Sequence, residues 1–189
     1  MRCDLPVLAV GPAVLLAAAF ALYADQGPPK TANPLAPSSM GADRITREVR
    51  HELLLLPYYG VFDNFAYRVD DGTVTLYGQV TRPTLKSDAE TVVKHIEGVK
   101  RVDNQIQVLP LSPNDDRIRM AEYRAIYSRP GLDRYALQAI PSIHIIVDNG
   151  HVTLVGVVTS QGDKDLAGIA ANGVSGAFSV TNDLSVEDR

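Results

Sequence analysis

The chain has 189 residues, enough for one ordinary domain or two very small ones. Its content of 46% hydrophobic and 21% charged residues is typical of a globular protein, and its formal net charge of −4 argues against a protein that neutralises nucleic-acid phosphates. The single cysteine, Cys3, can form no internal disulfide, so the fold must be stable through packing alone.

Residues 1–24 have the layout of a secretory signal peptide. Arg2 precedes an apolar run from Leu5 to Tyr23, which contains the small-x-small cleavage pattern Ala19-Phe20-Ala21. The run is also close to the ~20 residues that span a bilayer, so an uncleaved N-terminal membrane anchor is the alternative. Either interpretation predicts an exported protein, periplasmic or tethered by its N-terminal helix.

Residues 25–42 predict a linker. Four prolines stand among small and polar residues in this segment. Such a composition cannot bury a core and favours extended, solvated conformations. We therefore expect a Pro-rich disordered linker between the N-terminal segment and the folded part of the chain.

The rest of the chain is an internal repeat. The sequence V-D-D-G-T-V-T-L-Y-G-Q-V at residues 69–80 returns as V-D-N-G-H-V-T-L-V-G-V-V at residues 147–158. A second block, residues 98–108, matches residues 176–186 at the same spacing. Two separated blocks in one register indicate a tandem duplication. The expected modules are residues 43–109 and 113–187.

The first module begins with a predicted helix and a predicted hairpin. Apolar residues recur at helical spacing from Ile45 to Leu56, Asp43 is a plausible N-cap, and Pro57 ends the pattern. Two alternating runs then meet at Asp71-Gly72, and the second module has Asn149-Gly150 at the same place. These dipeptides are strong signals for a type I′ turn, whose two central residues need positive φ.

A second helix and a last strand complete the module. Pro83 is expected in the first turn of that helix, and the last strand runs from Val102 to Val108. The second module repeats the order α-β-β-α-β, with helices at about 115–129 and 160–171 and strands at about 143–148, 151–158 and 180–186. The predicted fold class is α+β: two tandem small α-β-β-α-β modules, each a three-stranded mixed sheet covered on one face by two helices.

Four glycines are predicted to be structural. Gly72 and Gly150 occupy the positive-φ positions of the two hairpins. Gly78 and Gly156 lie inside strands, which glycine weakens unless something approaches closely. We expect the covering helix to be that neighbour.

The hairpin pattern V-x-D-G-x-V-x-L-x-G-x-V, followed by a helix and then G-V-x-x-V-x-N-x-I, resembles the BON-domain family of bacterial osmotically induced and nodulation proteins. The resemblance covers both modules. It implies an exported protein tied to envelope integrity and osmotic stress, which binds phospholipid or other envelope components and has no catalytic activity.

No residue pattern predicts catalysis, a cofactor or a metal site. The histidines, His51, His95, His144 and His151, lack ligand spacing and have no cysteine partner. Most carboxylates stand at turns and helix starts, where capping explains them. The sequence also contains no nucleophile elbow and no phosphate-binding loop.

The first helix of the second module is the predicted lipid-binding element. Five arginines fall within residues 117–134 of a module that is otherwise acidic. A helical wheel places Ile118, Ala121 and Ala125 on one apolar face and a second, aromatic face roughly opposite. Tyrosines beside arginines suit a surface of anionic headgroups. The candidate residues are Arg117, Met120, Tyr123, Arg124 and Tyr127.

Three partners remain open for the aromatic face of this helix. An anionic phospholipid membrane is the first. The second is intramolecular, since the aromatic face can pack on its own sheet or on the first module. The third is a protein partner, such as another envelope protein. The alternative function for the whole chain is a chaperone-like or partner-binding envelope protein, in which an exposed sheet edge adds a strand from a partner. Nucleic acid is not expected as a partner, because the acidic total charge and the export signal both oppose it.

Overall fold

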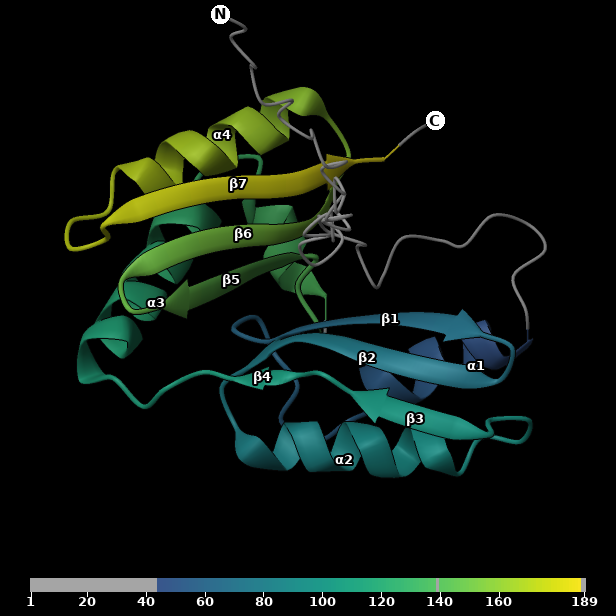
Figure 1. Ribbon diagram of the computed structural model, residues 1–189. Helices are drawn as coiled ribbons and strands as arrows, with labels where there is room; N and C mark the ends of the chain where they lie inside the picture. The colour runs from purple at the N-terminus through teal and green to yellow at the C-terminus, as the bar shows by residue number, and fades with distance from the viewer. Residues whose placement is uncertain (1–43, 139, 188–189) are drawn as a thin grey trace, which may run out of the picture. The chain divides into compact units, whose positions relative to one another are not determined.

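The computed structural model describes residues 44–138 and 140–187, which form two α+β modules (Figure 1). The expected signal or anchor, the linker and the proposed N-cap Asp43 lie outside the described residues. The first module contains, in chain order, α1 (Arg44–Leu54), β1 (Asn64–Asp70), β2 (Thr73–Val80), α2 (Pro83–Lys94), β3 (Arg101–Asn104) and β4 (Gln107–Val108).

The second module repeats this order with one addition. Its elements are α3 (Pro113–Tyr127), the 3-10 helix η1 (Asp133–Leu137), β5 (Ile143–Asp148), β6 (His151–Val158), α4 (Gln161–Asn172) and β7 (Ser179–Val186). The predicted α-β-β-α-β order is confirmed. The η1 turn was not predicted. Leu132 and Tyr135 of this segment are buried in the core of the module.

Each sheet is mixed, as expected. The central strands β2 and β6 pair antiparallel with their hairpin partners β1 and β5 and parallel with the last strands β3 and β7. In the first module the last strand is interrupted, because β3 and β4 pair separately with β2. The single strand predicted for residues 102–108 is therefore two short ones.

An asparagine at the same position in the last strand of each module forms a hydrogen bond to the preceding helix. Asn104 Nδ2 donates to the backbone oxygen of Lys86 in α2 over 2.8 Å, and Asn182 Nδ2 donates to that of Lys164 in α4 over 2.7 Å. Each asparagine also accepts a hydrogen bond from the amide two residues later. The repeated V-x-N-x-[IL] pattern therefore has a structural explanation.

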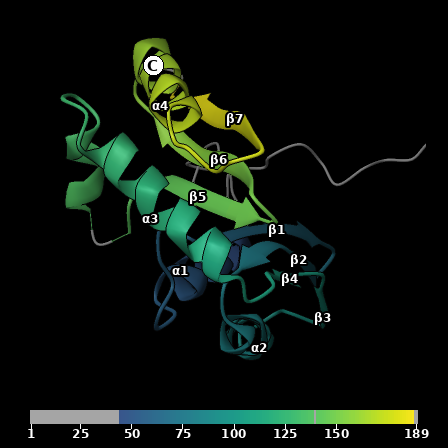
Figure 2. The same cartoon turned by 90° about the vertical axis from the view of Figure 1, so that its left-hand side faces the viewer.

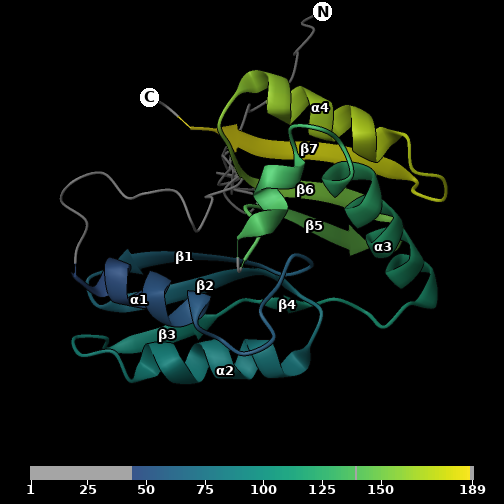
Figure 3. The ribbon, with the colours of Figure 1, turned by 180° about the vertical axis from the view of Figure 1, so that it is seen from behind.

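Two helices cover one face of each sheet. Seen from behind, α1 and α2 lie over the sheet of the first module, and α3 and α4 lie over that of the second (Figure 3). Each module has its own core, with Phe65, Leu76 and Leu85 in the first, and Ile143, Leu154 and Leu184 in the second. No helix among residues 44–138 and 140–187 has the length and apolarity needed to cross a bilayer.

Both hairpins have the predicted turn. Asp71 and Gly72 have φ values of 45° and 80°, and Asn149 and Gly150 have values of 51° and 81°. Positive φ at both central residues is the signature of the type I′ turn. In the second module the turn is also tied to α3, because the Asp115 carboxylate accepts from the amides of Asn149 and Gly150 over 3.0 and 2.9 Å.

The strand glycines are structural for a different reason from the one expected. A Cβ at Gly78 would lie 2.0 Å from the carbonyl oxygen of Asn64, and one at Gly156 would lie 1.9 Å from that of Ser142. The close neighbour is therefore the backbone leading into the paired strand, and the predicted covering helix was wrong. Both glycines also have strongly positive φ, 117° and 137°, which L side chains rarely adopt.

The segment after α1 reaches the second module. The Ile145 amide donates to the backbone oxygen of Val61 over 2.8 Å. The His144 ring stacks on Tyr59 with centroids 5.6 Å apart, and its Nδ1 donates to the backbone oxygen of Gly60. The two modules are therefore joined by specific contacts of this segment as well as by the chain between them.

Candidate functional site

The α3 helix is fixed at its N-terminus by capping. The Ser112 hydroxyl accepts from the Asp115 amide over 3.2 Å, and Pro113 occupies the first turn. Because the Asp115 carboxylate also holds the β5–β6 turn, the first turn of α3 is anchored to the sheet. Figure 2 shows α3 running in front of β5.

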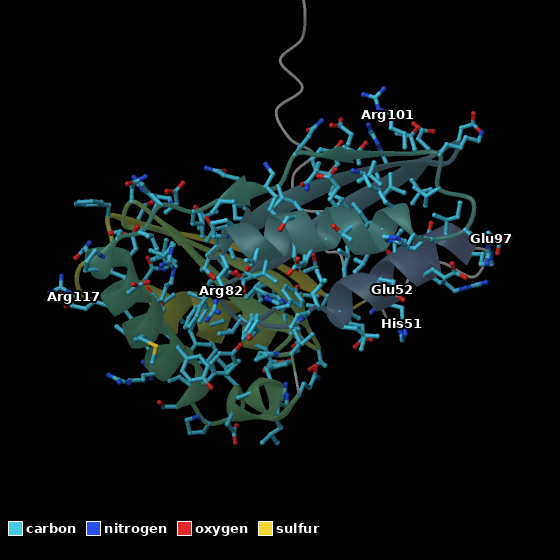
Figure 4. All side chains as sticks on the ribbon, turned by 90° about the horizontal axis from the view of Figure 1, so that it is seen from below. His51, Glu52, Arg82, Glu97, Arg101 and Arg117 are labelled. Carbon is cyan, nitrogen blue, oxygen red and sulfur yellow. The ribbon has the colours of Figure 1, made fainter. Side chains whose placement is uncertain are left out.

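Three of the five candidate residues lie on the solvent face of α3. Arg117, Met120 and Arg124 are exposed, and their spacing of three and four residues places them on one face of the helix. Figure 4 shows Arg117 projecting outward from the ribbon. Met120 is 44% exposed, which is high for a large apolar side chain. This set, Arg117, Met120 and Arg124, is the basic face of α3.

The two candidate tyrosines face the interior instead. Tyr127 is buried, its hydroxyl donates to the backbone oxygen of Ile143 over 2.6 Å, and burial raises its pKa. Tyr123 is half-buried and packs against Tyr127 and against Phe62 of the first module, with centroid distances of 4.8 and 6.3 Å. The structure thus separates the five residues into an exposed basic face and an inward-facing tyrosine pair.

The arginines of α3 have different partners. Arg117 donates to the Asn114 side-chain oxygen over 2.5 Å. Arg124 has no side-chain hydrogen bond or ion pair to any residue that the structure describes. Arg119, by contrast, is buried, donates to Asp116 Oδ1 over 2.6 Å and donates to the backbone oxygen of Val147 over 2.7 Å. The basic face therefore keeps two positive charges with no carboxylate partner among the described residues.

Glu122 is a buried charged group that the sequence did not single out. Its side chain is fully buried, and neither carboxylate oxygen has a hydrogen-bond partner in the described part of the chain. Desolvation by burial raises its pKa from 4.5 to about 7. A glutamate on a helix that is rich in arginine is expected to form an exposed ion pair, so no sequence signal distinguished it.

No arrangement typical of catalysis or metal binding stands out. Among residues 44–138 and 140–187 no three His, Cys, Asp or Glu side chains are grouped so that they could hold a metal ion. His144 is buried, and this burial lowers its pKa from 6.5 to about 4, which keeps the ring neutral at physiological pH.

Two α-β-β-α-β units in tandem define a class of protein built from repeated small α+β modules. The chain belongs to the BON domain family, whose profile matches residues 42–110 and 131–188, well over half of its length. The helix α3 lies outside the matched residues. Membership in the family therefore carries no information about the residues of its basic face.

The chain is similar to osmotically-inducible protein Y of Escherichia coli (strain K12), with 31% identity over 126 residues. The alignment covers 66% of this chain and 62% of that relative. Two solved structures of CdsD, a structural protein of the type III secretion system of Chlamydia trachomatis, are also similar at 13% identity. They cover 75% and 78% of this chain and 91% and 99% of their own, with TM-scores of 0.30 and 0.28.

Proposed function

We propose that the protein is a non-enzymatic, exported envelope protein that associates with anionic phospholipid membrane and supports envelope integrity or osmotic stress tolerance. The osmotic role is suggested by the similarity to osmotically-inducible protein Y and by membership in the BON domain family. Periplasmic location, free or tethered, is suggested by the apolar run that follows Arg2.

The observation that carries membrane association is the basic face of α3. Each basic residue near an anionic surface contributes about 1 kcal/mol of attraction. Arg117 and Arg124 have no carboxylate partner among the described residues, so no internal ion pair has to break when they meet a phosphate. Met120 between them offers an apolar side chain of flexible shape. With both tyrosines turned inward, the expected binding is mainly electrostatic and therefore sensitive to salt.

Co-sedimentation with vesicles tests this function. We expect the protein to bind phosphatidylglycerol-rich vesicles at low salt, to be released at high salt, and to ignore neutral phosphatidylcholine vesicles. Changing both Arg117→Glu and Arg124→Glu should abolish binding. The matched control, Arg68→Glu with Arg101→Glu, makes the same charge change at two exposed arginines of the first module and should reduce binding much less. Equal loss in the two double variants would reject the basic face as the binding site.

The alternative is a periplasmic chaperone-like or partner-binding protein. It is favoured by the edge strand β7, whose eight residues pair with β6 on one side and with no other strand that the structure describes. An open edge can accept a strand from a partner. This function predicts that the protein suppresses aggregation of an unfolded client, whatever the charge of the lipid present.

A further inference from the structure

A groove opens between the two helices of the first module. Its volume is about 380 Å³, within the range of sites that hold a small ligand or a side chain. Val92 and Ile96 give it an apolar part. Three carboxylates line it, Glu48 and Glu52 from α1 and Glu97 from the residues that follow α2. Figure 4 labels Glu52 beside α1 and Glu97 at the end of the module's helix pair. An occupant needs a positive charge and an apolar portion.

Arg44 of the same chain already pairs with two of the carboxylates that line the groove. The Arg44 guanidinium donates to the Glu48 carboxylate over 3.0 Å, to the Glu97 carboxylate over 3.2 Å and to the Glu97 backbone oxygen over 3.1 Å. The Glu52 side chain, one helical turn beyond Glu48, has no hydrogen bond or ion pair to any described residue. One carboxylate of the groove is therefore left for a cation from outside.

The second module does not repeat this chemistry. At the spacing of 78 residues that aligns the two modules, Thr91, His95 and Glu97 correspond to Ile169, Gly173 and Ser175. Of these three lining positions, the one that carries a carboxylate in the first module, Glu97, is a serine in the second. The Glu97 carboxylate is therefore a feature of the first module that the shared fold does not require.

We propose that this groove binds a basic segment of a partner polypeptide. A lysine or arginine side chain of the partner lays its methylene groups on Val92 and Ile96 and places its charged end at Glu52, an arrangement that suits long cationic side chains. A half-exposed ion pair contributes little and is screened by salt, so the interaction is weak and reversible. The site uses no residue of α3, so the test of peptide binding is independent of the test of membrane association.

A peptide titration followed by NMR tests this site without vesicles. The probe is the octapeptide Gly-Arg-Leu-Gly-Gly-Arg-Leu-Gly with blocked ends, and its counterpart with glutamate in place of both arginines is the control. We expect saturable shifts of the amide signals of Glu52, Thr91 and His95 in the ¹⁵N-labelled protein. These shifts should vanish at high salt and be absent with the glutamate peptide.

Three variants make the test specific. Glu52→Gln should weaken peptide binding about fivefold, the size expected from losing one exposed charge pair. Thr91→Arg should block the groove with a cation of its own and abolish the shifts. Asp70→Asn removes one negative charge from an exposed strand end of the same module and should leave the affinity unchanged. Thermal melting checks that each variant is folded.

Several results would overturn the proposal. Equal weakening by Glu52→Gln and Asp70→Asn would mean that the peptide is attracted only by the overall acidity of the protein. Shifts confined to α3 or β7 would place the peptide elsewhere. Shifts of the groove amides that follow protein concentration without peptide would identify a second copy of the chain as the occupant.

Discussion

The side chain of Glu122 is a buried acidic group in the second module whose burial is not offset by any hydrogen bond to a described residue. It is fully buried with no partner for either oxygen, while the neighbouring Arg119 is engaged by Asp116 and by the backbone of Val147. An unpaired buried carboxylate is tolerated when it takes up a proton. Its raised pKa, about 7, means that Glu122 is close to half ionised at neutral pH.

We predict that Glu122→Gln changes the pH dependence of stability. The folded pKa is above the unfolded value of 4.5, so the folded state holds a proton that the unfolded state releases. The favourable contribution is complete below pH 4.5 and is lost as pH rises through 7. Between pH 5 and pH 8 the free energy of unfolding, measured with urea, should fall by up to about 3 kcal/mol more in the wild-type protein than in the variant.

Comparing the wild-type protein with Glu122→Gln cancels the contributions of the other titratable groups to the pH dependence of stability. His144, whose pKa is lowered to about 4, contributes in the opposite direction, because its neutral form is favoured by folding and stability falls as pH drops from 6.5 towards 4. That contribution is the same in wild type and variant. If the free energy of unfolding differs between wild type and variant by the same amount at pH 5 as at pH 8, Glu122 does not titrate as described.

At the scale of elements, each hairpin depends on one strand glycine. Gly78 and Gly156 take equivalent positions in β2 and β6, and in both the backbone carbonyl leading into the paired strand occupies the space of a side chain. The strands cannot separate to admit a Cβ without losing ladder hydrogen bonds. The repetition of glycine at the same place in both modules therefore follows from strand geometry.

We predict that Gly156→Val unfolds the second module. The new Cβ would meet the Ser142 oxygen at 1.9 Å in a backbone conformation that valine rarely adopts, so a loss of about 4 kcal/mol or more is expected. The control is Gly162→Ala in α4, where the nearest atom to a new Cβ is 3.7 Å away and φ is not positive. Thermal unfolding followed by circular dichroism measures both, and an unchanged melting temperature for Gly156→Val would refute the role.

At the scale of the whole described chain, the segment after α1 couples the two modules. Val61 and Phe62 pack against the core of the second module, and Ile140 packs against the core of the first. Small modules of this size have marginal cores, so each gains from the apolar area that the other covers. Tyr123 of α3 belongs to this contact, since it packs on Phe62.

We predict that Phe62→Ala destabilises the second module although Phe62 belongs to the first. Removing the ring takes away one of the two aromatic neighbours of Tyr123 and should lower the free energy of unfolding by about 1–3 kcal/mol, measured with urea. Tyr58→Ala, in the same segment, is the control. That side chain is 71% exposed and contacts Arg82, so its loss should cost less than about 1 kcal/mol. Equal effects of the two substitutions would show that Phe62 does not couple the modules.

The sequence by itself determined the repeat, the order of elements, the type I′ turns and the α+β class. These features depend on local signals: apolar periodicity, the Asp71-Gly72 and Asn149-Gly150 dipeptides, and Pro83 at a helix start. Each signal acts over a few residues, so neighbours in the chain suffice to interpret it. The interruption between β3 and β4 and the η1 turn were not predictable in this way, because they depend on how the segments pack.

Only the tertiary structure decided what each side of α3 contacts. The helical wheel placed apolar residues on two opposite faces of α3. The structure buries Tyr127 against Ile143 at the start of β5 and packs Tyr123 on Phe62, whereas Met120 stays exposed. The groove beside Glu52 likewise joins residues some 40 positions apart. Contacts between distant segments are set by packing, and a local pattern on one helix cannot specify which partner covers it.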